Sequence, residues 1–215
     1  MGGGRRIPEA TVARLPVYLR VLHESTGRVQ TISSEVLASR AGVNAAQVRK
    51  DLSYLGSYGT RGVGYEVEYL VRQINRRLGL DAERRVAIIG AGNLGQALAG
   101  YRGFPARGFH VVVVFDADPA KIGAVIGETV VQPASSMPEA LREHGVDIGV
   151  ITTPARPAQA VADALVEAGI RSILNFAPTT VLVPDHVALR QVDLGIELQI
   201  LSFYQQSVAG ATVGV

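Results

Sequence analysis

The sequence predicts an α/β protein of two domains, a small helical domain with a hairpin and a larger domain with a doubly wound parallel sheet. Strand-like and helix-like segments alternate from residue 85 onward. Apolar strands in such an alternation form a parallel sheet that helices cover on both faces. Before residue 80, short amphipathic helices precede a glycine-rich stretch that is typical of a hairpin. The domains are expected to meet at residues 79–83, because a glycine after the last periodic residue ends a helix.

Composition limits the classes of protein to consider. Apolar residues make up 47% of the 215 residues, which is enough for the cores of two modest domains. No apolar run reaches the ~18 residues of a membrane span, and the N-terminus lacks the apolar middle region of a secretory signal. The chain has no cysteine, so disulfides, thiolate metal sites and cysteine nucleophiles are excluded. We therefore expect a cytoplasmic protein with no membrane partner and no metal site.

Charge is distributed unevenly along the chain. Residues 1–80 carry 12 Lys and Arg against 6 Asp and Glu, a net charge of +6, and residues 81–215 carry 9 against 13, a net charge of −4. The two parts together give the +2 of the whole chain. A basic first third joined to an acidic remainder indicates that the first third meets a polyanion. Chance clustering of charges on a solvated surface is the alternative.

Helical periodicity organises the first domain. A first helix is expected over residues 8–24, with an apolar face made by Val12, Leu15, Leu19 and Leu22. A short second helix should start at residues 31–34 and end at 41–42. Asn44 is expected to cap a third helix in a pattern with Gln47 that resembles a capping box. On that helix Val48, Leu52 and Leu55 should face the core, and a fourth helix follows at 66–78.

Two short helices followed by a hairpin at residues 57–65 describe a winged helix, in which the second helix of the helix-turn-helix enters the major groove of DNA. Polar side chains of the third helix and of the hairpin are then available to nucleic acid. The predicted DNA contacts are Gln47, Arg49, Lys50, Ser53, Tyr58 and Arg61. Arg61 at the hairpin tip suits a narrow minor groove. Which of these side chains read bases and which bind phosphate stays open, and a solvated hairpin on a small dimerisation domain is the alternative.

The second domain is expected to contain five strands and three helices before its C-terminal segment. The strands are predicted at residues 85–89, 110–115, 129–131, 147–152 and 170–174, and the helices at 94–100, 137–144 and 156–168. A strand-like segment at 192–196 then precedes an amphipathic stretch at 198–208.

A glycine-rich turn links the first of these strands to the helix that follows. Gly90, Ala91, Gly92, Asn93, Leu94 and Gly95 form a GxGxxG motif between a strand and a helix, the context that dinucleotide binding requires. Gly90 permits the tight turn, Gly92 lets the backbone approach a pyrophosphate, and Gly95 permits close packing of helix on strand. These residues predict a Rossmann domain.

An acidic residue ends the next strand. Asp116 lies 21 residues after Gly95, near the ~20 expected of the acid that binds the adenosine ribose. A carboxylate there accepts hydrogen bonds from ribose hydroxyls and repels a 2′-phosphate, which favours NAD(H) over NADP(H). Asp118 and Pro119 are expected to start a helix, as N-cap and first helical residue.

Nothing in the second domain indicates a catalytic residue. None of the four histidines lies in a recognisable catalytic motif, and the region after the fifth strand is too short for a substrate domain. A Rossmann domain joined to a DNA-binding domain is best interpreted as a sensor. A nicotinamide-dependent oxidoreductase with a helical accessory domain is one alternative, and a sensor of CoA or another adenine nucleotide is a second.

The chain resembles the Rex family of redox-sensing bacterial repressors over nearly its whole length. The resemblance is carried by residues 47–53 (QVRKDLS), 56–65 (GSYGTRGVGY), 90–95 (GAGNLG) and 174–178 (LNFAP). It implies a homodimer that binds double-stranded operator DNA when NADH is scarce and is released by NADH, with NAD+ competing for the same site. It also implies that the nicotinamide end is lined by Thr153, Pro154, Asn175, Phe176, Ala177 and Pro178.

The resemblance also concerns the C-terminus and a switch. It implies a C-terminal helix that is exchanged between protomers, with Phe203 and Tyr204 in the dimer interface. It further implies a ligand-dependent polar network of Arg20, Tyr101 and Asp193, which would couple the two domains. The expected division is a winged-helix domain at 1–80, a Rossmann domain at 84–197 and a dimerisation segment at 198–215, and residues 209–215 receive no role.

Overall fold

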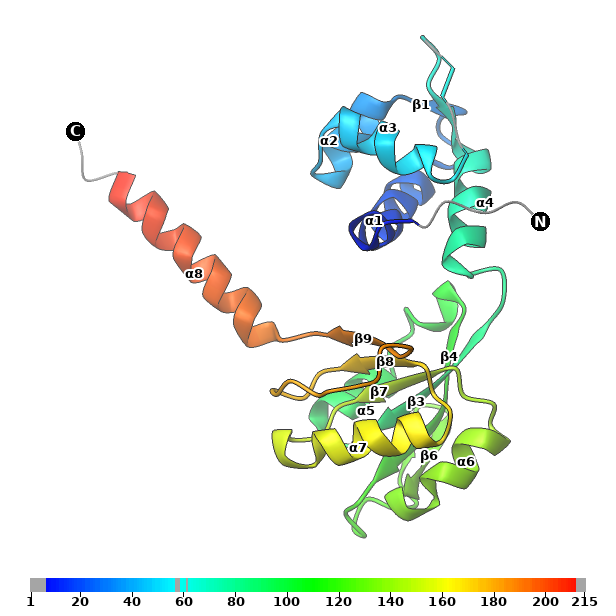
Figure 1. Cartoon of the computed structure of the whole chain (residues 1–215), viewed down its shortest axis with the longest axis vertical. Helices are drawn as coiled ribbons and strands as arrows, with labels where there is room; N and C mark the ends of the chain where they lie inside the picture. Colours follow the sequence, from blue (N-terminus) through cyan, green and yellow to red (C-terminus); the bar gives the residue numbers. More distant parts are fainter. Residues whose placement is uncertain (1–6, 57–58, 61, 212–215) are drawn as a thin grey trace. The chain divides into compact units, whose positions relative to one another are not determined.

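The computed structural model describes residues 7–56, 59–60 and 62–211, with side chains as far as residue 206 (Figure 1). The chain divides into two compact units, Met1–Ala82 and Glu83–Val215.

The first unit contains four helices and a two-stranded antiparallel sheet. The helices are α1 (Glu9–Ser25), α2 (Ser34–Ala41), α3 (Ala45–Ser53) and α4 (Val67–Leu78), and the strands are β1 (Thr31–Ile32) and β2 (Tyr65–Glu66). The predicted start of the second helix at residue 31 is wrong, because β1 pairs with β2 and the Ser33 side chain caps α2 by accepting the Val36 N–H at 3.2 Å. Thr60 and Gly64 exchange two backbone hydrogen bonds of 2.9 Å, as a hairpin requires.

The core of this unit forms on one stripe of α1. Leu15, Leu19 and Leu22 are buried as predicted, whereas Val12 is 41% exposed and its predicted core position is wrong. The buried stripe starts instead at Thr11 and continues through Tyr18. Thr11, Leu15, Tyr18 and Leu22 are spaced as neighbours on one helical face, and Val12 is rotated by about 100° from Thr11.

The second unit is a doubly wound domain around a seven-stranded sheet, in the order β5-β6-β4-β3-β7-β8-β9. All neighbouring pairs are parallel except β5 and β6. The strands are β3 (Arg84–Ile89), β4 (Phe109–Asp116), β5 (Val125–Ile126), β6 (Thr129–Pro133), β7 (Ile148–Ile151), β8 (Ser172–Asn175) and β9 (Ala188–Gln191).

Helices cover both faces of this sheet. Side chains of α6 (Met137–Glu143) and α7 (Ala155–Glu167) pack with Ala87, Ile89 and Phe115 on one face. On the other face, α5 (Asn93–Ala99) contributes Leu98 and Ala99 against Val86 and Ile88. Strands buried on both faces are apolar throughout, which is why the parallel sheet could be predicted from runs of Val and Ile. Two short 3₁₀ helices, η1 (Pro105–Arg107) and η2 (Ala134–Ser136), complete the unit.

Two predicted elements of the second unit are wrong. Residues 118–124 form a turn rather than a helix: the Asp118 side chain accepts the Ala120 N–H at 3.0 Å, and the unpredicted strand β5 follows at once. The last strand is β9 at residues 188–191 rather than 192–196, and α8 (Leu194–Ala211) begins where the strand was expected. Asp193 accounts for that start, because its Oδ1 accepts the N–H groups of Gly195 at 2.8 Å and Ile196 at 3.2 Å, as a helix cap does.

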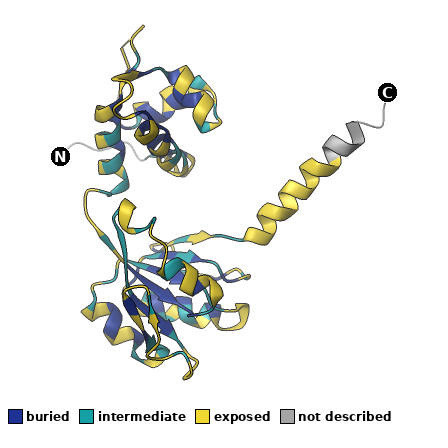
Figure 2. Ribbon diagram, turned by 180° about the vertical axis from the view of Figure 1, so that it is seen from behind, coloured by how far each residue is buried: buried dark blue, intermediate teal, exposed yellow. Residues whose placement is uncertain are grey.

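Helix α8 is apolar and exposed. Each side chain from Leu194 to residue 206 is exposed (Figure 2). The large apolar residues of this helix are spread around its circumference and are 45–66% exposed: Leu194, Ile196, Leu198, Ile200, Leu201, Phe203 and Tyr204. None of the helices in the described part of the chain has the length and apolar character that a bilayer span requires.

Candidate functional site

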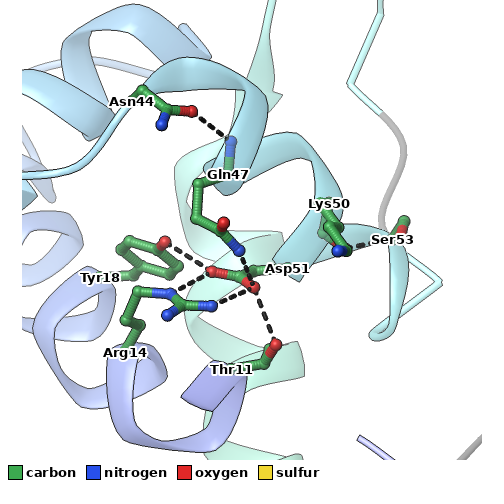
Figure 3. A network of polar contacts seen from close by, with 8 residues as sticks. All are labelled: Thr11, Arg14, Tyr18, Asn44, Gln47, Lys50, Asp51 and Ser53. Atoms are coloured by element: carbon green, nitrogen blue, oxygen red, sulfur yellow. Dashed lines mark hydrogen bonds and ion pairs between the residues drawn. The ribbon is translucent and has the colours of Figure 1, made fainter. Parts of the chain in front are cut away.

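Helix α3 is held in place at both its start and its inner face. The Asn44 side chain accepts the Gln47 N–H at 2.8 Å, which confirms the predicted cap. Val48, Leu52 and Leu55 are buried, as the periodicity predicted. The reciprocal half of the capping box is not made, because the Gln47 amide turns toward Asp51 (Figure 3).

Asp51 is the centre of a buried polar network between α1 and α3 (Figure 3). Its carboxylate accepts hydrogen bonds from Thr11 Oγ1 (2.8 Å), Arg14 Nε (2.7 Å), Arg14 Nη2 (2.9 Å), Tyr18 Oη (2.8 Å) and Gln47 Nε2 (2.9 Å). Burial by itself would raise the pKa of this carboxyl, but the hydrogen bonds from these four side chains, that of Arg14 first, lower it to about 2. The ionised carboxylate therefore links the first helix to the predicted recognition helix.

The predicted DNA contacts fall into three groups. Gln47 and Arg49 have partners within the protein: Gln47 bonds Asp51, and Arg49 Nη1 bonds Ser34 Oγ at 2.9 Å and lies 3.3 Å from Glu35. Lys50 and Ser53 are exposed on α3, with Ser53 Oγ donating to the Lys50 carbonyl at 2.7 Å. Tyr58 and Arg61 lie outside the described residues.

The GxGxxG turn in the second unit is closely packed. Gly90 has a φ of 113°, and a Cβ there would lie 2.9 Å from the Thr152 backbone. A Cβ on Gly95 would collide with the Gly90 carbonyl oxygen. Gly92 precedes α5 and has open space around its missing Cβ. The three glycines therefore match the roles that a tight turn, an approaching ligand and close helix packing require.

Asp116 ends β4 beside this turn. Its Oδ2 accepts the Ala91 N–H at 2.7 Å and lies 3.1 Å from Lys121 Nζ, and its Oδ1 accepts the Asp118 N–H at 2.8 Å. Burial opposes ionisation here, but the two backbone N–H groups and the Lys121 ammonium hold the pKa of the carboxyl below its ordinary value. An ionised acceptor is thus present where the ribose-binding acid was predicted.

The loop after β7 reaches the same edge of the sheet. Thr152 Oγ1 donates to the Gly90 carbonyl at 2.7 Å, which ties this loop to the glycine turn. Thr153 Oγ1 is buried and has no hydrogen-bond partner among the described residues. Pro154 then precedes α7. An unpaired buried hydroxyl is rare in proteins, and at the carboxyl edge of a parallel sheet it fits a polar ligand atom.

The loop after β8 completes this edge. The Asn175 side chain is fully buried: Nδ2 donates to the Thr179 carbonyl (3.0 Å) and to Gln191 Oε1 (2.7 Å), and Oδ1 accepts the Ala177 N–H (2.9 Å). Asn175 therefore shapes the loop, and we expect it to approach a ligand through its backbone. Ala177 is buried, Phe176 is half-buried and Pro178 is exposed.

The structure brings the predicted nucleotide-binding residues together. The strands that they follow are adjacent in the order β4-β3-β7-β8, so their carboxyl ends meet along one edge. In open α/β sheets ligands bind outside this edge, where the strand order reverses. The residues present fit a dinucleotide. Among the described residues, no group of three or more His, Cys, Asp or Glu side chains could hold a metal ion.

The predicted switch residues belong to both units. Arg20 is exposed on α1 in the first unit. In the second unit, Tyr101 is 49% exposed and its ring meets Phe104 edge-on, with centroids 5.1 Å apart. Asp193 caps α8. The strand expected at residues 192–196 would have contained Asp193, which instead lies at the start of α8.

Sequence reasoning missed several residues at both sites. Asp51 could have been found, because it lies three residues after Val48 on the predicted core face, where a charge needs a partner. Lys121 follows Asp116 by five residues, but only the turn at 118–124 brings its ammonium to the carboxylate. Thr152 and Gln191 act on groups distant in sequence, and no local pattern indicates them.

Comparison with known proteins assigns both halves of the chain. Residues 6–53 match a family model described as the N-terminus of a putative DNA-binding protein, and residues 81–179 match one described as a CoA binding domain. A Streptomyces griseus protein named redox-sensing transcriptional repressor Rex is 59% identical over 207 residues, which are 96% of this chain and 82% of the relative. The Carboxydothermus hydrogenoformans protein of the same name is 50% identical over 201 residues, 93% of this chain and 97% of the relative.

Solved structures of similar proteins support the same assignment as the sequence relatives. The chain is similar to RSP in complex with β-NAD+ and operator DNA, with 38% identity, a TM-score of 0.88 and 98% of both chains covered. It is also similar to RSP in complex with β-NADH, with 37% identity, a TM-score of 0.86, and 97% of this chain and 98% of the other covered. A third structure, with a TM-score of 0.86, describes RSP as a Rex-family repressor. Taken with the sequence identities, these matches show that the chain belongs to the Rex family of redox-sensing transcriptional repressors.

Proposed function

We propose that this protein is a transcriptional repressor that binds operator DNA as a homodimer when NADH is scarce and is released when NADH binds its Rossmann unit. The observation that carries the proposal is the ionised Asp116 carboxylate against the Ala91 N–H of the glycine turn. That pairing puts a ribose acceptor next to a turn suited to a pyrophosphate. The proposal places the protein in the cytoplasm, where a bacterial operator is found.

The first unit supports the DNA part of the proposal. Helix α3 presents the exposed Lys50 and Ser53 while its inner face is fixed to α1 through Asp51. A recognition helix needs such a fixed inner face, since base contacts depend on the register of its outer side chains. The basic balance of residues 1–80 supplies the attraction to phosphate. We therefore assign Lys50 and Ser53 to the DNA interface. Arg49 and Gln47 would join it only if their hydrogen bonds within the protein break.

The exposed apolar surface of α8 supports the homodimer. Seven large apolar side chains on this helix are 45–66% exposed. Apolar patches of this extent mark protein interaction sites. We propose that a second copy of this chain covers α8, with the helix exchanged between protomers. Phe203 and Tyr204 would then be buried in the dimer interface.

Coupling between the sites follows from linkage. If NADH weakens DNA binding by some factor, DNA weakens NADH binding by the same factor. The proposal requires that the two ligands favour different arrangements of the two units. We propose that three residues respond to the nicotinamide and favour one arrangement of the units over the other: Arg20, Tyr101 and Asp193.

A DNA-binding titration tests the proposal. The operator duplex that RSP binds is labelled, and fluorescence anisotropy follows its complex with this protein as NADH, NAD+ or NADPH is added. We expect binding without NADH, and release by NADH at a concentration about tenfold or more below that of NAD+ or NADPH. A CoA compound that releases DNA where NADH does not would instead support a sensor of another adenine nucleotide.

Two glycine variants extend this test to the nucleotide-binding turn, one as the test and one as its control. Gly95→Ala puts a Cβ against the Gly90 carbonyl and should remove the NADH response while DNA binding persists. Gly100→Ala is the control, because its Cβ would lie 3.6 Å from the Gln96 carbonyl, an ordinary contact. Equal NADH responses in the two variants would contradict the assigned site. Steady oxidation of NADH by a protein that does not bind DNA would favour the oxidoreductase.

A further inference from the structure

The Asp116 carboxylate is paired with a cation from its own chain. Lys121 Nζ lies 3.1 Å from Asp116 Oδ2, and the two side chains are 37% and 11% exposed. Lys121 is brought there by the turn after β4, in which its N–H donates to the Asp118 carbonyl at 3.0 Å. A lysine ammonium therefore stands beside the group assigned to the adenosine ribose, an assignment that rests on the proposed function.

The two charges of this pair act oppositely on a dinucleotide that carries a 2′-phosphate. The carboxylate repels the phosphate, whereas the ammonium attracts it. The backbone N–H groups of Ala91 and Asp118, which donate to Asp116 at 2.7 and 2.8 Å, are also donors that a phosphate can use. Asp118, the next acid in the turn, is exposed and accepts the Ala120 N–H.

We propose that Lys121 is a specificity-determining residue: it is already placed to bind a 2′-phosphate, and Asp116 prevents this by holding the ammonium and the two N–H groups for itself. The pair then recognises a ribose with free hydroxyls, since Asp116 accepts and Lys121 donates at the same edge. Loss of the carboxylate leaves three donors that converge on one position.

The test measures NADPH and NADH affinity by titration calorimetry in four variants. Asp116→Ala should bind NADPH about tenfold or more tightly than the unmodified protein, and NADH more weakly. The double variant Asp116→Ala with Lys121→Met should lose that gain. Asp116→Ala with Arg142→Ala is the matched control, because Arg142 is an exposed residue of α6 and its loss changes the net charge equally; it should keep the gain.

Lys121→Met alone tests the proposal without disturbing the glycine turn. With a bare carboxylate, NADPH should be disfavoured relative to NADH by a further factor of about three or more. Circular dichroism and thermal unfolding check that each variant is folded. If Asp116→Ala is unfolded, the ratio of NADPH affinity to NADH affinity in Lys121→Met decides whether the proposal holds.

The outcomes separate this inference from the proposed function. If the unmodified protein binds no NADH, the proposed function fails. If it binds NADH, but Asp116→Ala gains no affinity for NADPH or keeps its gain without Lys121, the role of Lys121 is overturned. An unchanged ratio of NADPH affinity to NADH affinity in Lys121→Met overturns the role of Lys121 as well.

Discussion

The Arg14 guanidinium on α1 holds the Asp51 carboxylate on α3 with two hydrogen bonds, from Nε to Oδ2 at 2.7 Å and from Nη2 to Oδ1 at 2.9 Å. Asp51 is fully buried, and the pairing raises the pKa of Arg14 above its already high ordinary value. A two-point bond of this kind fixes distance and orientation together. The helix that presents Lys50 is thereby fixed to the helix that carries Arg20, so a ligand-dependent contact at Arg20 would act on the DNA-reading surface.

This network should make the stability of the first unit depend on acid. The pKa of Asp51 is about 2, below its ordinary 3.8. A carboxyl with a lowered pKa stabilises the fold above about pH 4 and loses that contribution as the pH falls toward 2, which corresponds to roughly 2 kcal/mol. Urea unfolding followed by circular dichroism at several pH values measures this.

Asp51→Asn and Glu35→Gln separate this effect from general acid unfolding. Asp51→Asn leaves the Arg14 charge without its partner and should cost roughly 3 kcal/mol at neutral pH. It should also flatten the acid dependence. Glu35 pairs with Arg49 on the surface and its side chain is 69% exposed, so Glu35→Gln should leave the free energy of unfolding at neutral pH nearly unchanged. An unchanged acid dependence in Asp51→Asn would show that another group titrates.

Lys50→Ala should weaken operator binding by about tenfold or more, because Lys50 is exposed on the proposed recognition helix, where a lysine would contact a base edge or a phosphate. A smaller dependence of affinity on salt would identify a phosphate contact. Anisotropy titrations at several salt concentrations measure both quantities. Arg142→Ala, in the other unit, is the control and should leave operator affinity unchanged; equal losses in both variants would indicate a net-charge effect alone.

Asp193→Asn tests the switch without removing the helix cap. The Asp193 side chain caps α8, so removing it should cost about 1 kcal/mol through the cap alone. The asparagine keeps an acceptor for the cap and removes the charge that Arg20 would contact. We expect NADH affinity to stay within about threefold, while much more NADH is needed to release operator DNA.

Calorimetry and anisotropy on Asp193→Asn give the two quantities separately. Asp185→Asn is the control, because Asp185 is an exposed residue of a loop in the same unit. Release by NADH at the same concentration as for the unmodified protein would remove Asp193 from the proposed switch.

Replacing apolar side chains of α8 should separate the protomers. Leu198 and Phe203 are 65% and 66% exposed, and both would be buried in the proposed dimer. The double variant Leu198→Ser with Phe203→Ser should be a monomer by light scattering after size-exclusion chromatography. It should also bind a two-half-site operator more weakly, since two recognition helices must bind together. Gln199→Ser, on the same helix, should remain a dimer; a dimer in both variants would place the interface elsewhere.

Local sequence determined the elements whose signals are local. Val48, Leu52 and Leu55 are buried because helical periodicity alone puts them on one face. Gly90 and Gly95 occupy the positions that the spacing predicted, since only a residue without Cβ fits a φ of 113° or a helix packed on the Gly90 carbonyl. The strand ending at Asp116 and the cap at Asn44 follow from the same short-range rules.

Tertiary structure decided which polar groups meet. The sequence predicts that Gln47 contacts DNA, and only the fold shows that its amide donates to Asp51. Asp118 was expected to start a helix and residues 192–196 to form a strand, whereas strand pairing of β5 and the early start of α8 make Asp118 a turn residue and Asp193 a cap. Lys121 reaches Asp116, and Thr152 reaches Gly90, only in the folded chain. A buried charge or donor takes the partner that packing brings within about 3 Å, and separation along the chain says little about that distance.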